Sequence, residues 1–171
     1  MPLSPDRPFD LATAILDAVI GGYEDDGVDL PELRFVSAGP PVDDCPLVAV
    51  HLGAMSPSEV NAANDSAEVN SAGVGFSVRT GEYIVTIIRC TPEQLTRRGG
   101  RWVAPTAEVR EDASEVLYSD GIRVVNAVSA AQRAGELAGC NELMFGNWVV
   151  IGPSGGHVGG ATTLRVALTR G

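Results

Sequence analysis

The segment GEYIVTIIRC at residues 81–90 constrains the fold of this chain more than any other. Successive side chains of a β-strand point to opposite faces of the sheet, so a strand exposed on one side alternates apolar and polar residues. Here both alternating sets are mostly apolar: Tyr83, Val85 and Ile87 on one side, and Ile84, Thr86 and Ile88 on the other. The pattern predicts a central strand over residues 82–89.

Four other short runs predict further strands. LRFVS at 33–37 and LVAVHL at 47–52 are rich in β-branched and aromatic residues, and the turn-forming segment AGPPVDDCP separates them. NWVVIG at 147–152 is another apolar run. In ATTLRVALT at 161–169, Leu164, Val166 and Leu168 alternate with less apolar neighbours, as in a half-buried strand. The sequence therefore predicts that the chain ends with a strand, a glycine-rich loop and a strand.

Two segments have the periodicity of amphipathic helices. Over residues 10–23, apolar residues recur at spacings of three and four. The longest helical pattern keeps one apolar stripe over residues 109–131. Asp120 and Gly121 interrupt this stripe, which predicts a kink, or a restart capped by Ser119 or Asp120. A buried functional carboxylate at Asp120 is the less favoured alternative.

A third helix start is predicted at residues 91–94, TPEQ, and the segment TRRGGRW soon ends it. Arg97, Arg98 and Arg101 stand beside Trp102 in that segment. Such a cluster can contact phosphate and stack on a base. In an acidic chain, a solvated loop or a salt-bridge patch between subunits is the favoured interpretation.

Residues 53–75 are rich in Ser, Asn and Ala and have weak periodicity. They predict a long surface excursion. Loops of this length inside a domain are usually functional, so the segment is interpreted either as an arm that reaches a neighbour or as a mobile loop.

Charge is distributed unevenly along the chain. The net charge is −10, and residues 1–70 hold 13 acidic residues against Arg7 and Arg34, while residues 71–171 hold nine against ten arginines. Such a chain should repel nucleic acid. The acidic part is interpreted as a solvated face, or as the lining of a passage through which DNA slides without binding.

The 171 residues predict one domain, 1–171, with a substantial core. Acidic residues interrupt the apolar positions near the N-terminus, so no leader is expected, and no apolar run is long enough to cross a membrane. Three cysteines without a pairing pattern predict reduced thiols, with Cys90 as a small buried apolar residue. Two separate histidines, His51 and His157, predict no metal site.

Residues 152–156 contain Gly-x-Ser-x-Gly, the pattern of a nucleophile elbow at Ser154. An elbow needs a strand, a sharp turn and then a helix. Here an alternating strand follows the glycines, and no acidic residue follows Glu142. The chain also has no lysine, which excludes a phosphate-binding P-loop. Residues 152–160 therefore predict a glycine-rich bend between two strands, with no catalytic and no cofactor-binding residue.

The chain resembles the tail terminator proteins of long-tailed, siphovirus-type bacteriophages of actinobacteria. The resemblance rests on the opening amphipathic helix, on IIRCTP at 87–92, on the PTAEV…VLYSDG region at 105–121 and on GPSGGHVGGATTLRVAL at 152–168. It covers most of the chain in order. Relatives often carry Cys in the glycine-rich loop, where this sequence has His157.

The resemblance implies an α/β (α+β) fold, with two main helices packed on a mixed, largely antiparallel sheet of about four to six strands. It implies a structural virion protein of the neck, assembled in the host cytoplasm, rather than an enzyme. Six copies would form a hexameric ring that caps the tail tube and ends its polymerisation. The ring would join a head-completion or stopper protein, and DNA would pass through its lumen without specific binding. The candidate interface residues are Arg97, Arg98, Arg101, Trp102, Gly155, Gly156 and His157.

Three alternatives remain open. Another phage neck component, such as a head-completion or stopper protein, would have a similar composition and would also form rings. A small serine hydrolase would use Ser154. A module that binds a small ligand would close its glycine-rich loop over that ligand.

Overall fold

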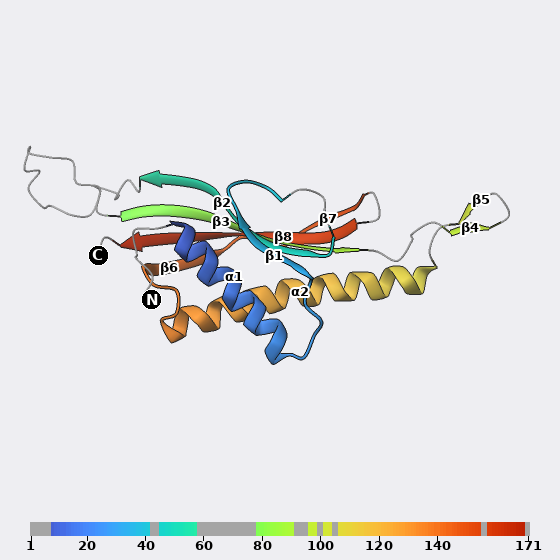
Figure 1. The fold of residues 1–171 in the computed structure, drawn as a ribbon, viewed down its shortest axis with the longest axis horizontal. Coiled ribbons are helices and arrows are strands. Elements are labelled where there is room, and N and C mark those ends of the chain that lie inside the picture. Colours follow the sequence, from blue (N-terminus) through green and yellow to red (C-terminus); the bar gives the residue numbers. More distant parts are fainter. Residues whose placement is uncertain are drawn as a thin grey trace, which may run out of the picture.

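The computed structural model describes residues 8–41, 45–57, 78–90, 96–98, 101–103, 106–154 and 157–169. Two helices lie on one side of a sheet, and a separate two-stranded sheet stands beyond the N-terminal end of the second helix (Figure 1). The helices are α1 (Pro8–Asp25) and α2 (Ala107–Ala134). The strands, in chain order, are β1 (Leu33–Ser37), β2 (Leu47–Pro57), β3 (Val78–Cys90), β4 (Thr96–Arg98), β5 (Arg101–Val103), β6 (Cys140–Phe145), β7 (Val149–Ser154) and β8 (His157–Thr169).

The main sheet confirms the predicted fold class. Its order is β1-β2-β3-β8-β6, and β7 also pairs with β8, so that β3 is central as its sequence predicted. All pairings are antiparallel except β1 with β2, which run parallel. The described residues therefore form an α+β fold with two helices and a mixed, mostly antiparallel sheet of six strands.

The core lies between this sheet and the two helices. The side chains of α1 that face the sheet, among them Ile15, Val19 and Tyr23, are fully buried. They meet the inward-pointing residues of the central strands, such as Tyr83 and Leu164. Burial of large apolar side chains on both partners supplies the main favourable contribution to folding.

Helix α2 is continuous through Asp120 and Gly121, so the predicted kink or restart is wrong. The side chain of Asp120 is completely buried, and it is held by partners from α1, β3 and α2 itself. These tertiary contacts outweigh the low helix propensity of the Asp-Gly pair. The less favoured alternative was a buried functional carboxylate at Asp120, and the structure confirms that this side chain is buried.

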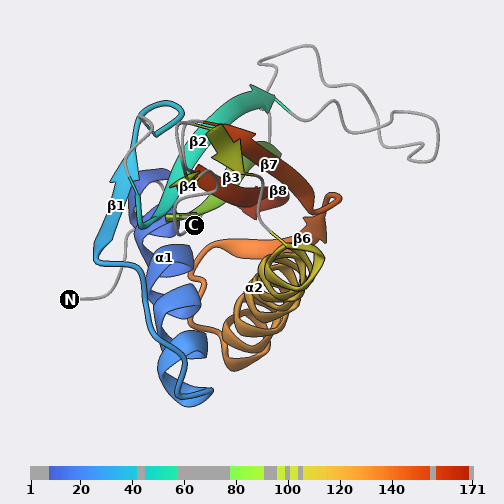
Figure 2. The same ribbon diagram turned by 90° about the vertical axis from the view of Figure 1, so that its right-hand side faces the viewer.

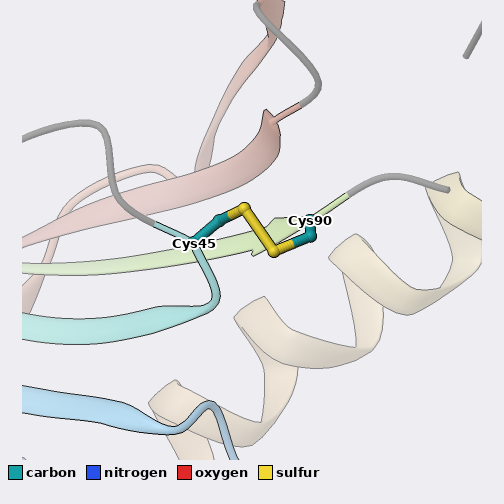
Figure 3. The surroundings of a disulfide bond; sticks show 2 residues. All are labelled: Cys45 and Cys90. Atoms are coloured by element: carbon teal, nitrogen blue, oxygen red, sulfur yellow. A yellow bond between two sulfur atoms is a disulfide. The ribbon is translucent and has the colours of Figure 1, made fainter. Parts of the chain in front are cut away.

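The opposite face of the sheet carries a smaller cluster of Leu47, Ala49 and Ile88, with Phe35 and Cys45 packed against it. At its margin Cys45 and Cys90 form a disulfide bond, with their Cα atoms 5.2 Å apart (Figure 3). The prediction of reduced thiols is therefore wrong for these two residues, and Cys90 is exposed rather than buried. Cys140 is a free thiol.

Two further features differ from the sequence-based expectation, and two predicted segments are not covered by the structure. Strand β2 continues to Pro57 through an irregularity at Leu52/Ala54, so the predicted excursion does not begin at residue 53. The predicted helix start at 91–94 lies outside the described residues, as do residues 58–77. Residues 96–98 and 101–103 pair as antiparallel strands, which was not predicted.

Candidate functional site

The surface with the clearest signature of an interaction site lies on described parts of the segment 143–164, a segment that includes no Asp, Glu, Lys or Arg. The segment covers the second half of β6, all of β7 and the first part of β8. Strands β6 and β7 both pair with the same edge of β8, β7 along its N-terminal part and β6 along its C-terminal part. In the described part of the chain no further strand pairs with β7, so its outer edge is free.

Trp148 joins this edge to α2. A Cβ atom added at Gly121 of α2 would lie 2.8 Å from the indole, and one added at Gly160 of β8 would overlap it. The indole thus fits between two glycines that leave room for it. Tyr118 lies three residues before Gly121 and four before Ile122, so these residues share one flank of α2, where Tyr118 and Ile122 are exposed.

Large apolar side chains are exposed on both sides of this edge. Val150 is paired with Gly160, beneath Trp148, whereas its neighbours Val149 and Ile151 point to the other face of the sheet. Figure 2 shows β6 and β7 on the side of the molecule away from α1. We call the following set the apolar edge: Tyr118, Ile122, Met144, Val149, Val150 and Ile151, which are between 41% and 66% exposed.

An exposed apolar strand with a free edge is a site for pairing with another chain, and soluble proteins usually protect such edges with charge or short length. The apolar edge has no charged side chain of its own within residues 143–164. The arrangement favours burial against a partner surface.

Behind this surface, a buried ion-pair cluster fixes α2 to the rest of the fold. Nε and Nη2 of Arg89 on β3 donate to the two carboxylate oxygens of Asp120, at 2.6 and 2.7 Å. The hydroxyl of Tyr23 donates to the same carboxylate at 2.6 Å. Arg123 lies over the ring of Tyr23, 4.8 Å from its centroid, and bonds to Asp26 at 2.7 Å.

This cluster is structural rather than reactive. Burial, together with the hydrogen bond to Asp120, raises the pKa of Tyr23 far above its usual range. The hydrogen bond to Asp120 raises the pKa of Arg89 as well. Tyr23 and Arg89 therefore hold their protons, and the carboxylate oxygens of Asp120 are occupied by donors.

The residues predicted to form an interface are only partly brought together. The backbones of Arg97 and Trp102 are opposite each other in the β4–β5 ladder, and so are those of Arg98 and Arg101. Gly155 and Gly156 lie outside the described residues. His157 begins β8, where it is opposite both Cys90 of β3 and Ser154 of β7.

The segment around Ser154 has strand geometry on both sides. Ser154 ends β7, and β8 begins at His157, so a strand and not a helix follows the serine. Two strands follow one another here as predicted, but the predicted loop of residues 152–160 is too long, because residues 152–154 belong to β7 and residues 157–160 to β8. Between them, residues 155–156 lie outside the described residues. Gly152 has a φ of 90°, a conformation that glycine adopts without strain.

His51, in β2, is only 5% exposed, and its Nδ1 atom has no hydrogen-bond partner among the described residues. Burial lowers its pKa. Within the described ranges, no group of three His, Cys, Asp or Glu side chains is arranged to hold a metal ion.

A groove of about 490 Å³ lies between α1 and α2. It is lined mainly by small residues, including Ala14, Ala18, Ala127 and Ala130, with carboxylates such as Asp17 at its margin. None of its lining residues comes from the glycine-rich segment, so the groove does not have the geometry expected of a ligand site that this segment would close.

Comparison with protein-family models gave no match, and comparison with curated proteins gave no significant one. In the described part of the chain, neither helix is long and apolar enough to cross a membrane.

Sequence reasoning missed the apolar edge, the Asp120 cluster and the disulfide. The apolar edge could have been found from the sequence, because residues 143–164 include no charged residue. The other two depend on residues far apart in the chain, because Tyr23 and Asp120 are separated by 97 positions and the two cysteines by 45.

Proposed function

We propose that this protein is a tail terminator of a long-tailed bacteriophage, a structural protein that caps the tail tube as a six-fold ring. The proposal combines the sequence resemblance over residues 87–92, 105–121 and 152–168 with the α+β fold. The ring ends polymerisation of the tube and forms the joint to a head-completion or stopper protein.

The apolar edge is the observation that supports the proposal most strongly. A ring needs each subunit to present a surface that its neighbour covers, and a contact between two different surfaces closes a ring where the rotation permits. A free, uncharged strand edge with Val149, Val150 and Ile151 exposed is suited to such permanent burial.

Capping requires no chemical step. One face of the ring matches the last ring of the tube, and the other face offers no surface to which a further tube subunit can add. The net charge of −10 is consistent with a lumen through which DNA passes without being held. In this proposal the described part of the chain acts by binding other proteins through its surfaces.

The test is polymerisation of the tail tube protein from the same genome, with and without this protein, followed by electron microscopy of tube lengths. Wild-type protein is expected to give short tubes with a ring at one end. Val150→Arg places a charge in the apolar edge and is expected to give long, uncapped tubes, since the buried charge prevents ring closure.

Phe9→Arg is the matched control, because Phe9 is also exposed (61%) but lies at the start of α1, on a different element from the apolar edge. It is expected to cap tubes like the wild type. Tubes whose length does not depend on the wild-type protein contradict the proposal, and so does full capping by Val150→Arg.

A second neck role, as a head-completion or stopper protein, predicts binding to the head-side connector and not to the tube end. Labelling the protein and locating it on tubes and on tail-free heads separates the two roles.

One observation bears on the hydrolase alternative: Ser154 and His157 are opposite each other across the β7–β8 ladder. A nucleophilic serine needs such a base, and also a group that orients the base. Hydrolysis of a small ester by the wild type that Ser154→Ala abolishes without unfolding would favour a hydrolase; equal rates in both exclude this use of Ser154.

A further inference from the structure

The disulfide lies at the end of the β2–β3 ladder. Leu47 of β2 is opposite Ile88 of β3. Cys45 lies two residues before Leu47, outside β2, and the Cys45–Pro46 peptide bond between them is cis. Cys90 ends β3 two residues after Ile88, and Cys45 packs against the small cluster that contains Ile88. The bond therefore fastens the segment just before β2 to the C-terminal end of β3 (Figure 3).

A histidine stands next to this disulfide. In the β3–β8 ladder Cys90 is directly opposite His157. Directly opposed residues of antiparallel strands point to the same face, with Cβ atoms about 5 Å apart. Cys45, Cys90 and His157 thus form one row at this end of the sheet, with Cys45 just before β2, Cys90 at the end of β3 and His157 at the start of β8. The row lies on the face of the sheet opposite the helices, where Leu47, Ala49 and Ile88 form the smaller core cluster.

All three members of the row are accessible to solvent, and the middle one most. Cys90 is exposed, and Cys45 and His157 are each partly exposed. A small thiol can therefore reach the disulfide without unfolding of the sheet. Cys140 differs, because burial raises the pKa of its thiol and it has no disulfide partner.

We propose that Cys45, Cys90 and His157 form a thiol–disulfide exchange site that a dithiol reductant opens in the folded protein. The thiolate of the reductant attacks Sγ of Cys45 and forms a mixed disulfide there, and the bond to Cys90 breaks. The electron pair stays on Sγ of Cys90, and an imidazole N–H of His157 donates a hydrogen bond to this leaving thiolate.

The second thiol of the reductant then completes the exchange. As a thiolate it attacks the sulfur of the reductant in the mixed disulfide, which releases Cys45 as a thiolate and leaves the reductant as a cyclic disulfide. Two electrons pass from the reductant to the protein, and both cysteine thiolates take up protons from water or buffer. Opening the site removes the covalent link between the segment just before β2 and the end of β3.

The experiment uses the full chain, with dithiothreitol as the probe. Samples are quenched with N-ethylmaleimide, and intact mass counts the labelled thiols. Before reduction at most one thiol, Cys140, is expected to react; afterwards three are expected. His157→Leu is expected to slow opening about five- to tenfold, because the leaving thiolate loses its donor. His157→Gln keeps an N–H donor and is expected to open within about twofold of the wild-type rate.

Two further measurements separate this role from a general loosening of the fold. The labelling rate of Cys140 is the internal control, and it should be the same in all three proteins. Opening of the wild type in low urea should keep its rate, since exchange in the folded state exposes little new surface. A rate that rises steeply with urea shows that unfolding controls the reaction and overturns the proposal. Equal rates for His157→Leu and the wild type overturn it as well, as does the finding of three free thiols before reduction.

Discussion

At the scale of single residues, Asp120 connects the three parts of the fold. Its carboxylate takes hydrogen bonds from Tyr23 of α1 and Arg89 of β3, and it contacts Arg123 within α2 at 3.4 Å. Local pattern predicted a kink or restart at this point, because Asp-Gly is a poor helical pair and the partners of Asp120, Tyr23 and Arg89, are 97 and 31 positions away. Local propensity predicts the cost of such a residue in a helix but not the contacts that compensate for it.

Replacing Asp120 should therefore be costly. Asp120→Asn keeps the shape of the side chain but leaves Arg89 without its ionic partner, and the expected loss in the free energy of unfolding is about 3–5 kcal/mol. Chemical denaturation followed by circular dichroism measures it. Asp26→Asn is the control, because Asp26 pairs with Arg123 while its side chain is 55% exposed; a loss of under about 1 kcal/mol is expected there. Similar losses for both variants would contradict the prediction.

His51 should make stability dependent on pH. Burial lowers its pKa in the folded protein below the value of about 6.5 in the unfolded chain. The unfolded state therefore binds more protons below that value, and stability falls as the pH is lowered from 7.5 through the folded pKa.

The expected slope for this one proton is at most about 1.4 kcal/mol per pH unit. His51→Leu should remove this slope between pH 7.5 and 5.5. Urea denaturation of both proteins across that range measures the difference; parallel curves would show that His51 does not contribute.

At the scale of the elements, two neighbouring glycines of α1 differ in how closely they approach α2: Gly22 packs against it and Gly21 does not. A Cβ atom at Gly22 would lie 2.6 Å from Cβ of Ala127, whereas one at Gly21 would have no atom within 4 Å. Gly22→Ala should push the helices apart and lower stability by about 1–3 kcal/mol. Gly21→Ala should raise it by up to about 1 kcal/mol, because alanine favours the helix. Thermal unfolding of the two variants is the measurement, and a shift of the same sign in both would be inconsistent with this packing.

Periodicity predicted the elements that bury one or two regular faces. The alternation in 82–89 identified β3, and the apolar stripe over 10–23 identified α1. Strand pairing could not be predicted from periodicity. The parallel register of β1 and β2 and the approach of Cys45 to Cys90 are set by tertiary contacts. Residues 53–57 have no alternating strand pattern in the sequence. They nevertheless belong to β2, because the backbone there pairs with β3.

At the scale of the whole molecule, the two sides of the domain differ in the partners they suit. The α1–α2 side carries much of the acidic surface, with Asp17, Asp25 and Glu136 around the groove. The β6–β7 side is uncharged over residues 143–164 and exposes the apolar edge. Burial of the apolar edge removes large apolar side chains from water, so the proposed function predicts assembly through the second side.

This asymmetry makes the salt dependence of self-association informative. Each copy carries a net charge of −10, so copies repel one another, and salt screens that repulsion. If the apolar edge forms the contact, raising NaCl from about 50 to 500 mM should strengthen association. If the arginines of β4 and β5 pair with carboxylates of the next copy, the same change should weaken it, because exposed ion pairs are screened. Sedimentation velocity at both salt concentrations decides between the two contacts. The triple variant Arg97→Gln, Arg98→Gln, Arg101→Gln changes the net charge from −10 to −13 (−10 − 3). It should still associate, and more strongly as salt is raised, in the first case, and it should lose the weakening by salt in the second.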